Sequence, residues 1–137
     1  MGYLIDNKPN QIVIAKVTLT PSNLLAPSII DIPEYPAVKN YHWQVLSMTG
    51  HITGGAIPYV GASAVHIQSS TAPNLQFRFQ GAYMSGPIDT WAFADINANA
   101  NITQFVDNDK LQIHNPVALT LGDSNLDLYI TAILIPT

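Results

Sequence analysis

The chain has 137 residues, a length that suits one domain with a core buried without disulfides or metals. It contains no cysteine, which excludes a disulfide-stapled secreted fold, a thiolate metal site and a cysteine nucleophile. Only 10% of its residues are charged, the net charge is −4, and the few Lys and Arg residues are scattered, so the basic face that nucleic-acid binding needs is missing.

The first half of the chain is expected to form short β-strands separated by proline and glycine. The run Gln11–Leu19 is rich in β-branched residues and apolar on both faces, which predicts a strand that is buried on both sides or lies at a subunit contact. The turn Pro21–Leu25, which Thr20 can cap, is the one helix candidate. Further strands are predicted at Ser28–Ile32, Tyr41–Ile52 and Ala64–Gln68.

The second half continues this pattern. Leu75–Gln80 alternates most clearly, with its three apolar side chains expected toward the core. Asp95–Ala100 is polar and is expected to be a loop. The last strand, which begins at Leu126, is apolar on both sides in its second half. Other strands are predicted at Ile88–Ala94, Asn101–Val106, Leu111–Ile113 and Val117–Leu121.

These strands predict the fold class. No segment has a sustained 3.6-residue period, and Glu, Lys and Arg, which favour exposed helices, are scarce. About eight to ten short strands with irregular loops are typical of a double-sheet jelly roll. We therefore expect residues 1–137 to form a single all-β domain, an antiparallel jelly-roll-type β-sandwich.

Targeting signals are not apparent in the sequence. The segment from Met1 to Asp6 lacks a charged start followed by a long apolar run, so no signal peptide is expected. No apolar run reaches the roughly 18 residues that a membrane-spanning helix needs. We therefore expect no membrane partner.

The four histidines are candidate metal ligands. His42, His51, His66 and His114 show no His-x-His or His-x-x-x-His spacing. A metal site built across strands from His42, His66 and a carboxylate is conceivable, as in double-stranded β-helix enzymes. Those enzymes usually show a compact His-x-Asp or His-x-His pair, which is missing here. We expect four polar strand or loop residues, and no metal or other cofactor.

Two further segments resemble functional motifs in part. Asp107–Asp109 begins like a calcium loop, but the required glycine and glutamate are replaced by Gln112 and Ala118, so a β-turn is expected. The segment Gly61–Val65 lacks the second glycine of a nucleophile elbow. No catalytic residue is predicted, and the chain is not expected to be an enzyme.

Aromatic residues leave an alternative open. A sugar-stacking platform could be formed by Trp43, Tyr59, Tyr83, Trp91 and Phe93. Single aromatics in strands are more often core residues or interface anchors. An exposed aromatic row would distinguish the two hypotheses.

The scarcity of charge bears on association. A surface with few charges is poorly protected against association, which suggests that much of it is covered in the working state. The alternative is an ordinary domain whose surface carries neutral polar residues. The strands that are apolar on both faces lie near the two ends of the sequence, which favours assembly. The predicted contact residues are Ile12, Ile14, Tyr129, Ile133 and Ile135.

Both ends of the chain carry a family resemblance. The opening Ile14–Leu25, with Val-Thr-Leu-Thr followed by a short turn and a leucine, resembles the start of small virion proteins of tailed bacteriophages. In that family a short apolar strand with a proline link comes next, followed by a strand beginning near Gly-Lys. Here Ile29–Pro33 and Val38–Tyr41 take these places, and the glycine is missing.

The close of the chain is similar too. Asn115–Leu119 leads through the Gly-Asp turn at residues 122–123 into the last strand, Leu126–Ile130. Family members tend to have a tyrosine late in that strand, where this chain has Leu134 and Ile135. The resemblance covers about the first third and the last fifth of the chain.

The resemblance implies a non-enzymatic jelly-roll protein attached to a phage head or tail, often as a trimer, and brings no catalytic residues. The expected function is capsid decoration or that of a head/tail accessory protein, in a virion assembled in the host bacterial cytoplasm. Expected partners are copies of itself and capsid, portal or tail proteins, without nucleic acid. A carbohydrate- or receptor-binding module is the second hypothesis, and a small β-sandwich enzyme the third.

Overall fold

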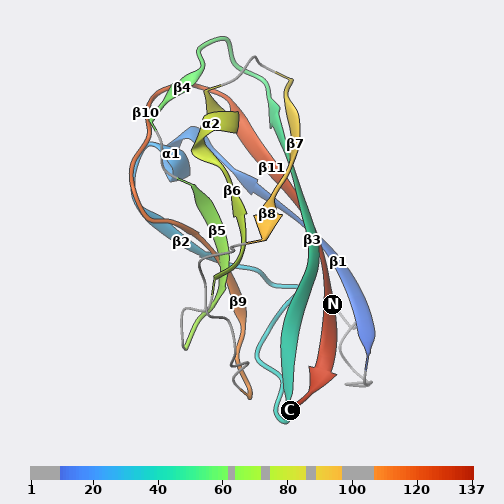
Figure 1. Cartoon of the computed structure of the whole chain (residues 1–137). Helices are drawn as coiled ribbons and strands as arrows, with labels where there is room; N and C mark the ends of the chain where they lie inside the picture. The colour runs from blue at the N-terminus through green and yellow to red at the C-terminus, as the bar shows by residue number, and fades with distance from the viewer. Residues whose placement is uncertain (1–9, 62–63, 72–74, 86–88, 97–106) are drawn as a thin grey trace.

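The computed structural model describes residues 10–61, 64–71, 75–85, 89–96 and 107–137, to which all structural statements refer. In this part of the chain, eleven β-strands form two main antiparallel sheets and a short two-stranded ribbon, with two helices of four residues each. The sheets pack against each other (Figure 1), so the prediction of an all-β sandwich is confirmed.

The first sheet has four strands in the order β1-β11-β3-β7. The first and last strands are neighbours, with Gln11 opposite Leu134 and Leu19 opposite Leu126. The long pair β11–β3 contains a β-bulge, at which Leu46 is the extra residue. The strands are β1 (Gln11–Leu19), β11 (Asn125–Pro136), β3 (Tyr41–Thr53) and β7 (Trp91–Phe93).

The second sheet has five strands in the order β2-β9-β5-β6-β8. They are β2 (Ser28–Asp31), β9 (Leu111–Asn115), β5 (Val65–Ser69), β6 (Leu75–Phe79) and β8 (Asp95–Ile96). A separate ribbon joins β4 (Tyr59–Val60) to β10 (Thr120–Leu121).

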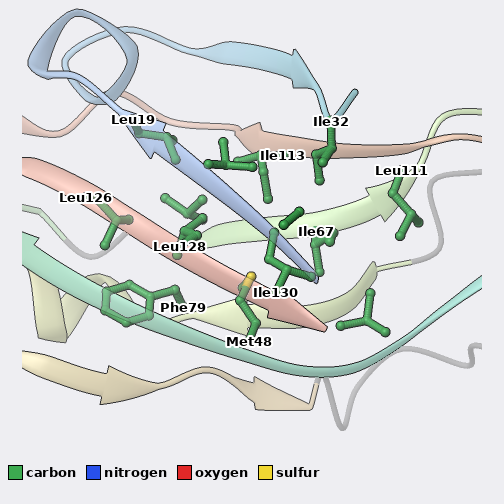
Figure 2. Close-up of a cluster of buried hydrophobic side chains, with 14 of the residues drawn as sticks. Leu19, Ile32, Met48, Ile67, Phe79, Leu111, Ile113, Leu126, Leu128 and Ile130 are labelled. Carbon is green, nitrogen blue, oxygen red and sulfur yellow. The ribbon is translucent and has the colours of Figure 1, made fainter. Parts of the chain in front are cut away.

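The core lies between the two sheets. Figure 2 shows Leu128 and Ile130 of β11 among side chains that include Ile67 of β5 and Ile113 of β9, and all four are buried. The Phe79 ring lies so close to Gly50 that a Cβ there would come within 2.3 Å of it. Only glycine leaves room for this ring, so the β3–β6 contact depends on Gly50.

A polar anchor connects the loop after β2 to the core. The buried Tyr35 hydroxyl lies 2.9 Å from the Val13 carbonyl oxygen and 3.0 Å from that of Ile130, and therefore holds the loop under the β1–β11 pair. The indole Nε1 of Trp43 donates to the Pro36 carbonyl at 2.8 Å. Burial raises the pKa of Tyr35 above its ordinary value, which keeps the hydroxyl protonated as a donor.

The predicted helical turn is confirmed as α1 (Pro21–Leu24). The Thr20 amide donates to Asn23 Oδ1 at 2.9 Å, which caps its first turn. The second helix, α2 (Gly81–Met84), was missed because four residues are too few for a helical period to be recognised.

Some predicted strand boundaries are wrong. Within Val117–Leu121 only residues 120 and 121 form a strand, and in the described part of Ile88–Ala94, which begins at residue 89, the strand is limited to β7. Asp95 and Ile96, expected in a loop, form β8 because they pair with Arg78 and Phe77 of β6. The predicted strand Asn101–Val106 lies outside the described residues.

Candidate assembly surface

The outer face of the four-stranded sheet carries large apolar side chains. On β1 the residues Val13, Ala15 and Val17 point inward, so Ile12 and Ile14 point outward and are 59% and 73% exposed. The prediction that β1 is buried on both sides is therefore wrong for the isolated chain, and its alternative, a subunit contact, stays open.

This outer surface, called the apolar face below, is built from cross-strand rows. Ile12 of β1 lies opposite Ile133 of β11, and Tyr129 of β11 lies opposite Thr49 of β3, which in turn lies opposite Phe93 of β7. The apolar face comprises Ile12, Ile14, Tyr129, Ile133, Ile135, Trp91 and Phe93.

Stacked rings extend across three strands of the apolar face. The His51 ring of β3 stacks on Trp91 of β7 with centroids 3.9 Å apart, and Trp91 stacks on Tyr129 of β11 at 5.7 Å. Lys16 Nζ lies 5.6 Å from the Tyr129 ring centroid, within the range of a cation–π contact. The stack orders these side chains while leaving Trp91 58% exposed.

Charge on this face is compensated internally. Lys16 Nζ lies 3.7 Å from Asp127 Oδ2, and the Thr18 hydroxyl donates to Asp127 Oδ1 at 2.5 Å. His51 Nε2 lies 3.1 Å from Asp89 Oδ1 at the margin. The apolar face therefore presents little uncompensated charge, although the whole chain has a net charge of −4.

The structure places all five predicted contact residues on this one face. Ile12 and Ile14 are exposed, and Tyr129, Ile133 and Ile135 are partly exposed. Their role in assembly stays a prediction. Trp91 and Phe93 belong to the same face but were not predicted to, because only the pairing of β7 with β3 brings them there.

The hypothetical five-residue aromatic platform does not exist as a surface. Trp43 and Tyr59 are buried, and Tyr83 packs edge-on against Phe79 at 5.3 Å. The Tyr59 hydroxyl donates to the Ser124 carbonyl at 2.5 Å, and burial raises the pKa of Tyr59 to about 12. Of the five, Trp91 and Phe93 remain well exposed, at 58% and 78%.

The histidines weighed as a metal pair lie in different sheets, with His42 on β3 and His66 on β5. In the described ranges, no three His, Asp or Glu side chains are grouped so as to hold a metal ion. Asp107 and Asn108 form the expected turn, whereas the carboxylate of Asp109 accepts hydrogen bonds from the Ser70 hydroxyl and the Thr71 amide, which are distant in sequence. Ser63 of the possible elbow lies outside the described residues.

Neither helix in the described part of the chain is long and apolar enough to cross a membrane.

Comparison with known proteins gives one weak likeness. No protein-family model matches the chain, and no curated protein matches it in sequence. Among solved structures, the chain is similar to one described as the acidic stable capsid structure of Helicobacter pylori bacteriophage KHP30, with 8% identity, a TM-score of 0.47 and 92% of each chain covered. A likeness of this size carries no argument about function.

Proposed function

We propose that this chain is a non-enzymatic structural subunit that assembles with copies of itself, as a trimer, through the apolar face. The observation that carries the proposal is the row of exposed Ile12 and Ile14 beside the stacked Trp91 and Tyr129. Burying apolar surface contributes about 25 cal/mol per Å². Contiguous apolar patches on a soluble protein usually mark interaction sites.

The distribution of charge favours a second copy of this chain as the partner that covers the apolar face. Two copies that each carry a net charge of −4 repel one another unless they meet where local charge is compensated. The Lys16–Asp127 pair provides this compensation within each copy. The apolar faces of three copies can therefore meet around a threefold axis without bringing uncompensated like charges together.

Beyond self-assembly, we propose that the chain is a single-domain jelly-roll protein of a tailed phage that acts in capsid decoration or as a head/tail accessory protein. This proposal rests on the sequence resemblance, whose segments include most of β1 and the start of β11. The strand order supports the jelly-roll assignment, because β1 pairs with β11, β2 with β9 and β5 with β6, a nested arrangement. We further propose capsid, portal or tail proteins as partners and assembly in the host bacterial cytoplasm.

The test is the molar mass of the purified chain by light scattering during size exclusion, from micromolar to several hundred micromolar. We expect a trimer for the wild type and a monomer for Ile12→Asp. The matched control is Ile29→Asp on the other sheet, because Ile29 is 58% exposed against 59% for Ile12 and both lie on edge strands. A wild type that stays monomeric, or equal dissociation by both variants, would contradict the proposal.

The phage assignment needs its own measurement. Mass spectrometry of purified phage particles from a host carrying the gene should detect the chain at a stoichiometry near that of a capsid or tail component. Its absence from the particles, with the chain present in the lysate, would remove the virion role and leave self-assembly standing.

Carbohydrate binding remains a second candidate because one observation favours it. Trp91 and Tyr129 are stacked with an interplanar angle of 25°, and Phe93 projects beside them. Stacked aromatic side chains can bind sugar rings. Binding on a glycan array that is lost in Trp91→Ala and kept in Ile12→Ala would place this function above self-assembly.

A further inference from the structure

The outer face of the five-stranded sheet carries a row of potential cations. His66 of β5 lies opposite His114 of β9 on one side and opposite Arg78 of β6 on the other. Ile29 of β2 and Asp95 of β8 are the cross-strand partners at the two ends. Three side chains that can carry positive charge therefore stand side by side, in a chain with only five Lys and Arg residues.

The two imidazoles are ordered within this row. The His66 and His114 rings meet edge to face with centroids 6.4 Å apart. His114 Nδ1 lies 3.2 Å from Gln68 Oε1, which accepts a hydrogen bond from it when Nδ1 carries the hydrogen. Both rings are partly buried, so they are held in place while remaining accessible.

Arg78 brings an unused hydrogen-bonding group to the row. Its Nε is buried and has no hydrogen-bond partner. Its cross-strand partner Asp95 accepts instead from Gln80 Nε2 at 2.9 Å, and among the described residues Arg78 forms no ion pair. The described residues therefore leave hydrogen-bonding capacity of this guanidinium unused.

Other acidic groups near the row are already engaged. Asp31 of β2 accepts from Lys110 Nζ at 2.8 Å and from Gln112 Nε2 at 2.7 Å, and these bonds lower its pKa. Burial, followed by the nearby charges of His114 and Arg78, lowers the pKa of His66 below the ordinary histidine value. Asp31 is therefore already paired with Lys110, and the groups beside His66 are positively charged or can become so.

We propose that His66, His114 and Arg78 form a binding site for a carboxylate group of an acidic segment on a partner protein. Arg78 presents the planar fork that pairs with carboxylates, and the histidines add charge and donors when protonated. One arginine and two histidines, on a chain whose net charge is −4 with its histidines neutral, suit one or two carboxylates better than a nucleic-acid backbone. This site lies on the opposite sheet from the apolar face and does not depend on self-assembly.

The experiment follows the imidazole C–H signals of the full chain by NMR while a hexaglutamate peptide is added at pH 5.5 and at pH 8. We expect shifts of the His66 and His114 signals and a dissociation constant at least about tenfold larger at pH 8 than at pH 5.5, because a protonated imidazole attracts a carboxylate and a neutral one does not. In a saturating peptide solution the pKa of His66 should rise. An absence of shifts at pH 5.5 would overturn the proposal.

Matched variants separate a site from general attraction. Arg78→Gln should weaken peptide binding at least about tenfold. Lys39→Gln removes the same charge from an exposed position elsewhere and should leave binding within about twofold. Equal losses in both variants would contradict a defined site. If Arg78→Gln does not fold, Arg78→Lys is used, because it keeps the positive charge without the planar guanidinium. Arg78→Lys should still weaken peptide binding, and an unchanged affinity would overturn the role of the guanidinium.

The peptide is compared with inorganic phosphate and a short single-stranded DNA at equal ionic strength. Stronger binding of hexaglutamate supports a protein carboxylate as the ligand. Equal or stronger binding of either phosphate compound would overturn that choice. The titration is repeated with Ile12→Asp, which should bind hexaglutamate as the wild type does, because the two sites lie on different sheets. Binding and self-assembly can therefore fail independently of one another.

Discussion

The two sheets have similar inner faces and different outer faces. Between the sheets, both contribute buried aliphatic and aromatic side chains. Outside, the four-stranded sheet presents isoleucines and stacked aromatic rings around one Lys16–Asp127 pair, whereas the five-stranded sheet presents mainly histidine, arginine, glutamine and aspartate, with Ile29 at its edge. Folding requires the inner pattern only. The chemistry of each outer face therefore indicates which interactions that face can make.

The largest expected effect separates inside from outside. Phe79→Ala, beside Gly50 in the core, should lower the free energy of unfolding by about 3–5 kcal/mol, because it leaves a cavity. Phe93→Ala on the apolar face should change it by less than about 0.5 kcal/mol at concentrations where the chain is monomeric. Urea denaturation measures both, and comparable losses would contradict the assignment of Phe93 to an exposed outer face.

A smaller effect tests the charge compensation of the apolar face. Asp127→Asn removes the partner of Lys16 and should lower the free energy of unfolding by about 1 kcal/mol. It also leaves a positive charge on each copy, so self-association should weaken at low salt and recover at high salt. Sedimentation at two ionic strengths measures this, and association that is unchanged at low salt would contradict the role of the pair.

The smallest effect concerns the outer face of the five-stranded sheet and the dependence of its stability on pH. The pKa of His66 is lowered by burial and by nearby positive charges, so the unfolded chain binds a proton more readily than the folded one. The stability that the neutral His66 contributes is fully present above the ordinary histidine pKa. It is lost as the pH falls from that value to the lower pKa of His66 in the folded chain. His66→Gln should make the free energy of unfolding less dependent on pH in this range. An identical dependence in both proteins would contradict the lowered pKa.

Much of the fold could be predicted from local pattern. The alternation in Gln11–Leu19 gave the strand and also placed Ile12 and Ile14 on the same side, because side chains alternate along a strand. Thr20 and Pro21 marked the start of α1 through known capping preferences. These features depend on residues that are close in sequence.

The remaining features depend on register between distant strands. Nothing near Trp91 indicates that it lies opposite His51, and the His66–His114–Arg78 row exists only because β9, β5 and β6 align in one register. The predicted strand Tyr41–Ile52 does not reveal from its sequence which side faces the core, so the burial of Trp43 depends on packing against the other sheet.

The central claim is that copies of this chain meet through the apolar face, and the exposure of Trp91 tests it most directly. The chain has two tryptophans, of which Trp43 is buried and Trp91 is 58% exposed. Acrylamide quenching of tryptophan fluorescence is measured across the concentration range of association, with Trp91→Phe used to subtract the Trp43 signal. Quenching of Trp91 is expected to fall as the chain associates, because contact with a second copy covers this side chain. Association with undiminished quenching, or no association, would contradict the central claim.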